Sequence, residues 1–223
     1  MSECVLTIDV EDWFHILGLP ATPPLERWDD LPSHVEKDFR TMLEVLREHD
    51  ARATCFFLGY VARRVPHLVR ETAALGHEIA SHGYAHRLVF ELTPEQFRED
   101  AATARTILED VIGAPVVGYR ASGFSLTAET TWFYEMLIEV GYEYDSSLFP
   151  ARRIHGGMPS DRLAPFRVEA AAGSIVEFPI SVGRVLGHPF CFCGGGYLRL
   201  FPYPLIRRLT RAVLREGRPV TGR

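Results

Sequence analysis

The sequence has little of what marks a membrane-spanning, secreted or nucleic-acid-binding protein. Within its 223 residues, no apolar run approaches the ~20 residues that a membrane helix needs. The first residues contain neither the basic nor the apolar segment of a secretory signal. The 29 acidic residues outnumber the 24 basic ones, so a basic surface for phosphate contacts is not expected. We therefore expect a cytoplasmic protein without a membrane span or a nucleic-acid partner.

Cysteine is also scarce, and its four positions form no recognisable metal or redox motif. Cys4 and Cys55 lie in apolar runs, where cysteine acts as a small hydrophobic residue. Cys191 and Cys193 are separated by one residue, unlike zinc-knuckle or redox pairs. We expect reduced, structural thiols. With 47% hydrophobic and 24% charged residues, the chain has the composition of a globular protein with a sizeable core.

Short apolar segments alternate with segments of helical periodicity, which predicts an α/β fold with a parallel sheet or barrel. Strands are expected at 4–9, 51–58, 77–81, 115–119, 142–145 and 174–179. Helices are expected around 35–46, 61–75, 94–111, 127–140 and 205–213, the second being broken near Pro66. Residues 150–173 are expected to be irregular, and 194–196 to form a flexible loop. The last helix has a basic face, which we interpret as a solvated outer surface.

Ionisable residues follow the ends of four expected strands. The acids Asp9, Glu11 and Asp12 end the first strand, His82 and His86 follow the third, Arg120 the fourth, and Asp145 the fifth. In parallel α/β folds the carboxyl ends of the strands meet at one rim, where ligands bind and chemistry takes place. These side chains are therefore expected to form one site.

The two histidines point to a metal ion. A spacing of four residues places His82 and His86 on one side of a helical turn, so both can reach the same ion. Imidazole and carboxylate together suit zinc or a similar divalent cation. Two histidines and one carboxylate also leave a coordination position open, as in catalytic sites.

The acids and the arginine complete this hypothesis. Alternation along a strand places Asp9 and Glu11 on one face, so one is expected to bind the metal and the other to take a proton from water. Asp12 replaces Glu11 if the strand ends earlier. Arg120 is expected to hold Asp9 in its ionised form. Asp145 either orients Arg120, helps to shape the site, or caps a turn.

Five segments carry a resemblance to a known family. Residues 7–15 read TIDVEDWFH, 76–86 GHEIASHGYAH, 118–121 GYRA, 144–147 YDSS and 194–199 GGGYLR. They resemble the motifs of NodB-type polysaccharide deacetylases, carbohydrate esterase family 4. The similarity is greatest to the branch linked to exosortase-associated exopolysaccharide loci, which is related to allantoinase-like and Helicobacter-type peptidoglycan deacetylases. It extends over essentially the whole chain.

The resemblance implies a distorted (β/α) barrel and a metal-dependent hydrolase that uses zinc. Its substrate would be an N-acetylated amino-sugar oligo- or polysaccharide, handled in exopolysaccharide biosynthesis. The residues carried over from the family are Asp9 and Arg120 for catalysis, Gly123 and Asp145 for the substrate and oxyanion, and Glu11 (or Asp12), His82 and His86 for the metal.

The C-terminal part departs from the family. The late histidine that protonates the leaving amine has no match, and the last strand is not expected, so His155 and His188 are the loop histidines left to consider. We therefore expect one domain over 1–223, C-terminally truncated relative to the family, with an open edge beside the first strand through which copies associate. Two alternative functions remain: an allantoinase-like hydrolase of a small cyclic amide, and a catalytically impaired metal- or glycan-binding remnant.

Overall fold

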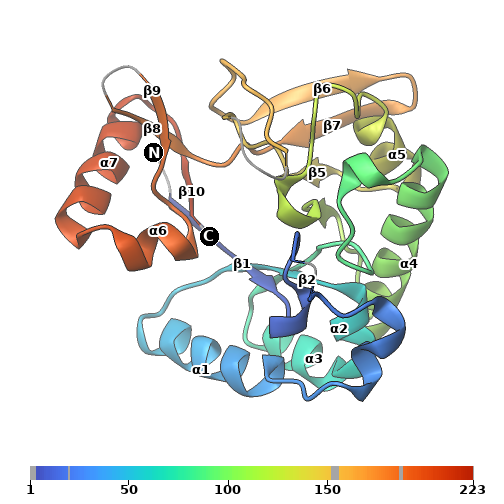
Figure 1. The fold of residues 1–223 in the computed structure, drawn as a ribbon. Coiled ribbons are helices and arrows are strands. Elements are labelled where there is room, and N and C mark those ends of the chain that lie inside the picture. Colours follow the sequence, from blue (N-terminus) through green and yellow to red (C-terminus); the bar gives the residue numbers. More distant parts are fainter. Residues whose placement is uncertain (1–3, 20, 152–155, 186–187, 223) are drawn as a thin grey trace.

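The protein folds around a curled, mostly parallel β-sheet with helices along its outer side (Figure 1). The computed structural model describes residues 4–19, 21–151, 156–185 and 188–222. The eight strands of the sheet follow the order β10-β1-β2-β3-β4-β5-β7-β6, and β6 runs antiparallel to β7. β8 and β9 form a separate antiparallel hairpin.

The elements have the following bounds. The strands are β1 (Cys4–Val10), β2 (Thr54–Phe57), β3 (Glu78–Ser81), β4 (Gly118–Tyr119), β5 (Tyr144–Asp145), β6 (Phe166–Ala170), β7 (Gly173–Glu177), β8 (Val182–Val185), β9 (His188–Cys191) and β10 (Val220–Gly222). The α-helices are α1 (Val35–Glu48), α2 (Gly59–Arg64), α3 (Pro66–Ala74), α4 (Pro94–Ile112), α5 (Phe133–Val140), α6 (Gly195–Leu200) and α7 (Tyr203–Arg215). Short 3₁₀ helices cover Trp13–His15, Leu25–Asp30, Val89–Glu91 and Ser122–Phe124.

The helices pack on the sheet through apolar residues at helical spacing. In α1 these are Val35, Phe39, Leu43 and Leu46, all buried. α4 begins where the sequence predicts, because the Thr93 hydroxyl accepts from the Gln96 N–H in a capping box. The resulting core fixes β1 to β5 with their carboxyl ends at one rim.

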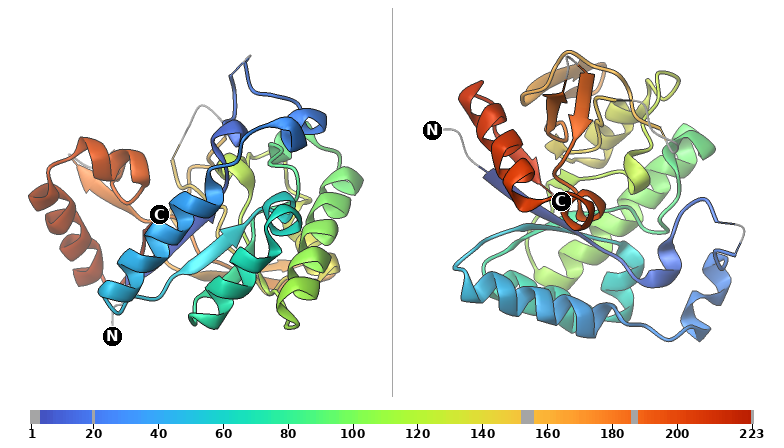
Figure 2. Two further views of the ribbon diagram at one scale, coloured as in Figure 1. Left: turned by 90° about the horizontal axis from the view of Figure 1, so that it is seen from below. Right: turned by 60° about the vertical axis from the view of Figure 1, so that its left-hand side comes forward.

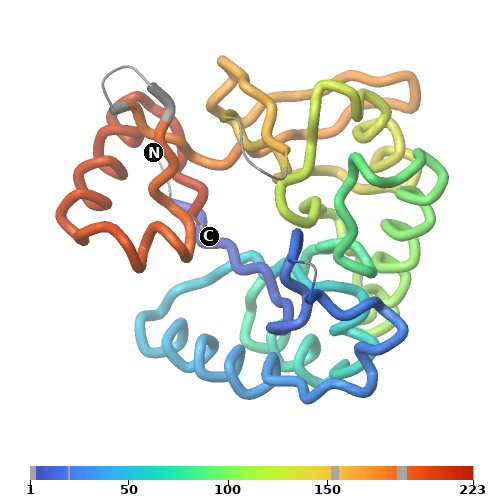
Figure 3. The backbone as a smooth tube through the Cα atoms, viewed as in Figure 1, coloured from blue at the N-terminus to red at the C-terminus, as the bar shows by residue number. Residues whose placement is uncertain are grey.

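A second, smaller core lies at the C-terminal end of the chain. It contains Phe192, Cys193, Ile206, Leu209, Val213 and Val220. Figures 2 and 3 show α6 and α7 on the opposite side of the molecule from α4 and α5. Among the described residues, no helix combines the length and apolar character needed to cross a membrane.

The structure corrects the expected open edge beside the first strand. Val220–Gly222 forms β10, which pairs in parallel with residues 4–6 of β1. β1 therefore has a neighbour on each side, β10 and β2, and in the described part of the chain the open edge on this side of the sheet lies at β10. The association of copies through an open edge stays a prediction. The sequence signal was missed because the strand is only three residues long and follows Gly217 and Pro219 closely.

Three further expectations are wrong. The segment 150–173, expected to be irregular, contains β6, whose polar residues alternate on an antiparallel edge strand. Residues 195–196, expected in a flexible loop, begin α6. The helix expected from Thr127 begins at Phe133, because the hydrogen bonds between Thr127 and Thr130 close a turn first.

Candidate active site

Three of the predicted residues form a group with the geometry of a metal site. Glu11, just after β1, and His82 and His86, just after β3, each offer a ligand atom, and these atoms lie within 4.8 Å of one another. The Nε2 of His86 is 2.8 Å from the Glu11 carboxylate. Both histidines are buried and Glu11 is half-buried. Two imidazoles and one carboxylate fit a zinc-type ion with an open position, as the sequence predicts.

The contacts around these residues favour the protonation states that a metal ligand needs. The His82 Nδ1 lies 2.8 Å from the carbonyl oxygen of Arg120, which favours a proton on Nδ1 and leaves Nε2 as the ligand atom. Burial raises the pKa of Glu11, but the hydrogen bond with His86 and the charges of His86 and His82 outweigh it, so the pKa is lowered overall. The Glu11 carboxylate is therefore kept ionised, as a metal ligand must be.

Asp9 and Arg120 form a buried ion pair beside this group. The Arg120 Nη1 donates to Asp9 Oδ1 at 2.8 Å, and the exposed fractions of the two side chains are 0% and 1%. Arg120 also donates to Thr7 Oγ1 and to both oxygens of Ser146, and it lies 4.0 Å over the ring of Phe56. With its donors used in this way, the guanidinium fixes one orientation of Asp9. The second oxygen of Asp9 is 3.7 Å from His82 Nε2.

Asp12, the alternative to Glu11, is used elsewhere. Its carboxylate accepts from the backbone N–H of Trp13 and His34 and from the Ser33 hydroxyl. These contacts tie the end of β1 to the start of α1 and turn Asp12 away from the histidines. Between the two acids, the structure places Glu11 with His82 and His86.

Asp145 is likewise not part of the metal-ligand group. It is fully buried, accepts from the hydroxyl and N–H of Ser147, and is hydrogen bonded to Glu177. Ser147 in turn accepts from the N–H of Ala121, the residue after Arg120. Both carboxylate oxygens of Asp145 are used in these contacts, which favours a role in shaping the Arg120 segment. Gly123 lies in the adjoining 3₁₀ turn with φ of 63°.

Glu177 is a buried acid, hydrogen bonded to the predicted site residue Asp145, that the sequence analysis missed. It ends β7, is fully buried, and accepts from Leu148 N–H and from the Tyr134 hydroxyl. Burial first, and then the neighbouring Asp145, raise the pKa of Glu177 well above its usual value. Burial also raises the pKa of Asp145, to about 6. The two carboxyl groups therefore share a proton, which joins the ends of β5 and β7. The sequence signal that could have identified Glu177 is an acidic residue at the end of an apolar, strand-like segment.

Asp100 on α4 was missed as well. It accepts from the N–H groups of Tyr84 and Ala85, at 2.7 and 3.1 Å, and so holds the loop between the two histidines. That loop needs support because His86 has a left-handed backbone, with φ of 50°. The signal in the sequence is an acid beside the buried apolar stripe of α4.

His15 is the third residue that was missed. Its ring is buried and lies 6.0 Å from the ring of His86. Its Nδ1 accepts from the Asp12 N–H at 2.9 Å. Burial and the nearby His86 lower the pKa of His15 to about 3, so the imidazole is neutral. Of the two loop histidines, His155 lies outside the described residues and His188 begins β9.

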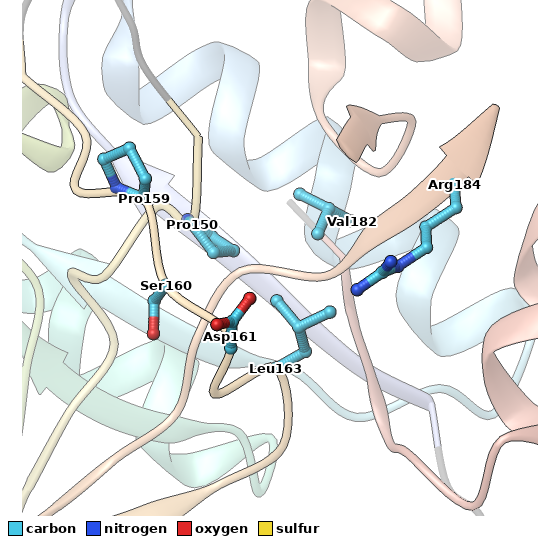
Figure 4. A pocket seen from close by; sticks show the side chains of 7 residues that line it. All are labelled: Pro150, Pro159, Ser160, Asp161, Leu163, Val182 and Arg184. Atoms are coloured by element: carbon cyan, nitrogen blue, oxygen red, sulfur yellow. The ribbon is translucent and has the colours of Figure 1, made fainter. Parts of the chain in front are cut away.

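A hollow of about 320 Å³ lies between Pro150, residues 159–163 and β8 (Figure 4). The side chains of Asp161 and Arg184 point toward one another across it. Pro150 and Val182 follow the carboxyl ends of β5 and β7 by five residues each. Its polar lining residues are suited to hydroxyl groups.

Two family models match the chain. The polysaccharide deacetylase model matches residues 27–144, more than half of the chain, and this range contains His82, His86 and Arg120. A domain of unknown function (DUF3473) matches residues 146–221. The boundary between the two matches falls directly after β5.

Curated relatives match shorter segments. A peptidoglycan-N-acetylglucosamine deacetylase of Bacillus cereus is 26% identical over 102 residues, which is 46% of each chain. A chitooligosaccharide deacetylase of Sinorhizobium fredii is 44% identical over 45 residues, 20% of this chain and 21% of that protein. The chain covers 21–46% of the length of the curated relatives it matches.

Solved structures resemble the whole chain. A Mycobacterium smegmatis protein described as a polysaccharide deacetylase is 26% identical, with 99% of this chain and 76% of that chain covered and a TM-score of 0.67. An allantoinase, 17% identical with the same coverage and a TM-score of 0.68, supports the fold alone. These likenesses confirm the expected fold, and with the family match they establish that the chain belongs to the polysaccharide deacetylase family.

Proposed function

We propose that this chain is a metal-dependent hydrolase that removes N-acetyl groups from an amino-sugar oligo- or polysaccharide, with zinc as the cofactor. The observation that carries the proposal is the Glu11, His82 and His86 group beside the buried Asp9–Arg120 pair. Membership of the polysaccharide deacetylase family supports hydrolysis of an acetyl group on a carbohydrate. The two imidazole donors support zinc over magnesium or calcium, which prefer oxygen ligands alone.

Each residue has a part in this reaction. Glu11, His82 and His86 would hold the ion, which when bound supplies a Lewis acid for water and for the acetyl carbonyl. Asp9 accepts a proton from the attacking water, and Arg120 keeps Asp9 ionised and correctly oriented. The Asp9 carboxyl then returns this proton to the departing nitrogen, which leaves acetate and a free amine. The backbone near Gly123 faces the developing oxyanion.

We infer the substrate class from a hollow in the protein and from the relatives. In this proposal the hollow in Figure 4 offers Ser160, Asp161 and Arg184 to groups beyond the reacting sugar. A single small cyclic amide has no need of such an extension, whereas a polymer has neighbouring sugars to place there. The names of relatives, peptidoglycan-N-acetylglucosamine deacetylase and chitooligosaccharide deacetylase, agree with an N-acetylated glycan.

The test is release of acetate from N-acetylglucosamine oligomers by the metal-free protein before and after addition of zinc. We expect zinc-dependent release, and a loss of about 100- to 10,000-fold in rate for Asp9→Asn, because the general base is removed. His82→Ala is expected to lose bound zinc. His67→Ala is the matched control, since this histidine lies exposed on α3 and pairs with Glu36.

Two results would overturn the proposal. Ring opening of allantoin without acetate release from any glycan would assign the chain to the small cyclic-amide hydrolases. Stoichiometric zinc binding without hydrolysis of either substrate would identify a catalytically silent metal- or glycan-binding domain.

A further inference from the structure

The outward side of α7 forms a basic surface that takes no part in the candidate site. We define the α7 arginine face by the residues that line a hollow of about 430 Å³ there: Tyr203, Pro204, Arg207, Arg208, Arg211 and Arg215. Figure 1 shows α7 at the edge of the molecule, on the far side from α4 and α5. A partner could therefore contact this face without contacting α4 or α5.

The charge of this face is not compensated locally. Residues 195–215, which span α6 and α7, contain five arginines and no acid, although the whole chain has a net charge of −5. Among the described residues, none of these five arginines has an ion-pair partner, in contrast to Arg40, Arg63 and Arg105 elsewhere on the surface. An unpaired cluster of this kind attracts anionic groups.

The packing of α7 fixes the direction in which the arginines point. Ile206, Leu209 and Val213 are buried in the smaller core. Tyr203, Arg207, Arg211 and Arg215 recur every four residues on an exposed side, over a length of about 18 Å at 1.5 Å per residue. The helix is thus held by one stripe and displays its arginines along another.

Two exposed apolar side chains lie where α6 ends and α7 begins. Leu200, the last residue of α6, is 76% exposed, and Tyr203, the first of α7, is 72% exposed. Their exposure to water is unfavourable unless a partner covers them, so this α6–α7 corner indicates an apolar layer next to an anionic one.

We propose that the α7 arginine face and the α6–α7 corner dock this protein on the surface of an anionic lipid bilayer. Lipid phosphates would pair with the arginines, and Leu200 and Tyr203 would enter the interface between headgroups and acyl chains. An acidic glycan would match the arginines but gain little from exposed leucines. A nucleic acid would also match the arginines. A long polyanion would, however, extend over the acidic remainder of the chain, whereas a flat membrane contacts one face only.

The experiment measures co-sedimentation of the full chain with phosphatidylcholine vesicles, with and without phosphatidylglycerol. We expect binding that requires phosphatidylglycerol and weakens with salt. The double variant Arg207→Glu/Arg211→Glu should bind at least about 25-fold more weakly, taking about 5-fold for each arginine. Leu200→Ser should weaken binding with all arginines retained. Arg70→Glu/Arg98→Glu, which changes the net charge equally on α3 and α4, should bind like the unaltered chain.

Three results would overturn the inference. They are no binding to phosphatidylglycerol vesicles, equal binding by the two double variants, or binding to soluble alginate that matches binding to vesicles and is unchanged by Leu200→Ser. The last result would assign the face to an acidic glycan. The altered residues are exposed, so circular dichroism and unaltered acetate release would show that the variants are folded.

Discussion

The guanidinium of Arg120 donates to Asp9 at 2.8 Å, and both side chains are buried. Removing one partner of a buried ion pair leaves the other charge without compensation. We expect Arg120→Ala to lower the free energy of unfolding by about 3–5 kcal/mol in denaturant titrations. Arg63→Ala, which breaks an exposed contact with Asp29, is the control and should change the free energy of unfolding little. Equal effects of the two variants would contradict the stabilising role of the buried pair.

The choice between Glu11 and Asp12 gives a second prediction. Glu11→Ala should weaken zinc binding by more than the about 10- to 100-fold expected from loss of a supporting contact. Asp12→Ala should retain zinc while losing stability, since Asp12 holds the start of α1. Calorimetric titration of the protein, first stripped with a chelator, measures both affinities. Loss of zinc in Asp12→Ala alone would reverse the assignment.

The buried Asp145–Glu177 pair predicts a pH dependence of stability. Burial raises the pKa of Asp145 from 3.8 to about 6, so the native state binds more protons than the unfolded state in this range. The contribution of Asp145 is therefore fully present below about pH 4 and lost as the pH rises through about 6. The contribution of Glu177, whose pKa burial and Asp145 raise well above its usual value, is lost at higher pH. Glu177→Gln keeps a hydrogen bond to Asp145 without the shared proton.

Unfolding free energies of the unaltered chain and Glu177→Gln, measured across this range, isolate the pair from the other carboxylates. As the pH rises, the free energy of unfolding of Glu177→Gln should increase relative to that of the unaltered chain. A constant difference would show that no shared proton exists.

Gly83 provides a test of the loop that holds the histidines. Its φ is +75°, and a Cβ there would lie 2.8 Å from Asp100 Oδ2, the acceptor for the loop. Gly83→Ala should therefore weaken zinc binding by about 10- to 100-fold, as expected for a supporting residue. Gly113→Ala is the matched control, with φ of +66° and nothing within 4 Å of the added carbon. It should cost about 1–2 kcal/mol of stability and leave zinc binding unchanged.

The hollow in Figure 4 predicts selectivity for longer substrates. Arg184 is exposed on β8 and points into it. Arg184→Ala should raise KM for an oligosaccharide by about 10-fold through a lost charge-assisted hydrogen bond, with kcat unchanged. KM for a short substrate should not move. An effect on kcat alone would place Arg184 outside substrate binding.

The parts of the site that could be predicted from the sequence are those that depend on strand ends. Asp9, His82 and Arg120 lie in or directly after short parallel strands, and parallel strands bring such residues together whatever the details of packing. The start of α4 at Thr93 could also be predicted, because all the residues of its capping box lie within four positions of the sequence.

The parts that could not be predicted depend on distant contacts. Asp12 is withdrawn from the metal-ligand group by Ser33 and His34, about twenty residues away in the chain. Asp100 supports the histidine loop from α4, and the pKa of Glu177 is raised by burial and then by Asp145 on a neighbouring strand. Periodicity and spacing carry no information about such pairs.

β10 also bears on the orientation of Asp9, the proposed proton acceptor. Thr7 donates its hydroxyl proton to the Gly222 carbonyl and accepts from Arg120, which holds Asp9. Three hydrogen bonds thus connect β10 with the Asp9 carboxylate, and the first of them joins residues 215 positions apart. Fraying of β10 would therefore loosen the carboxylate to which we assign the proton, so the proposed reaction depends on a three-residue strand that touches none of the reacting atoms.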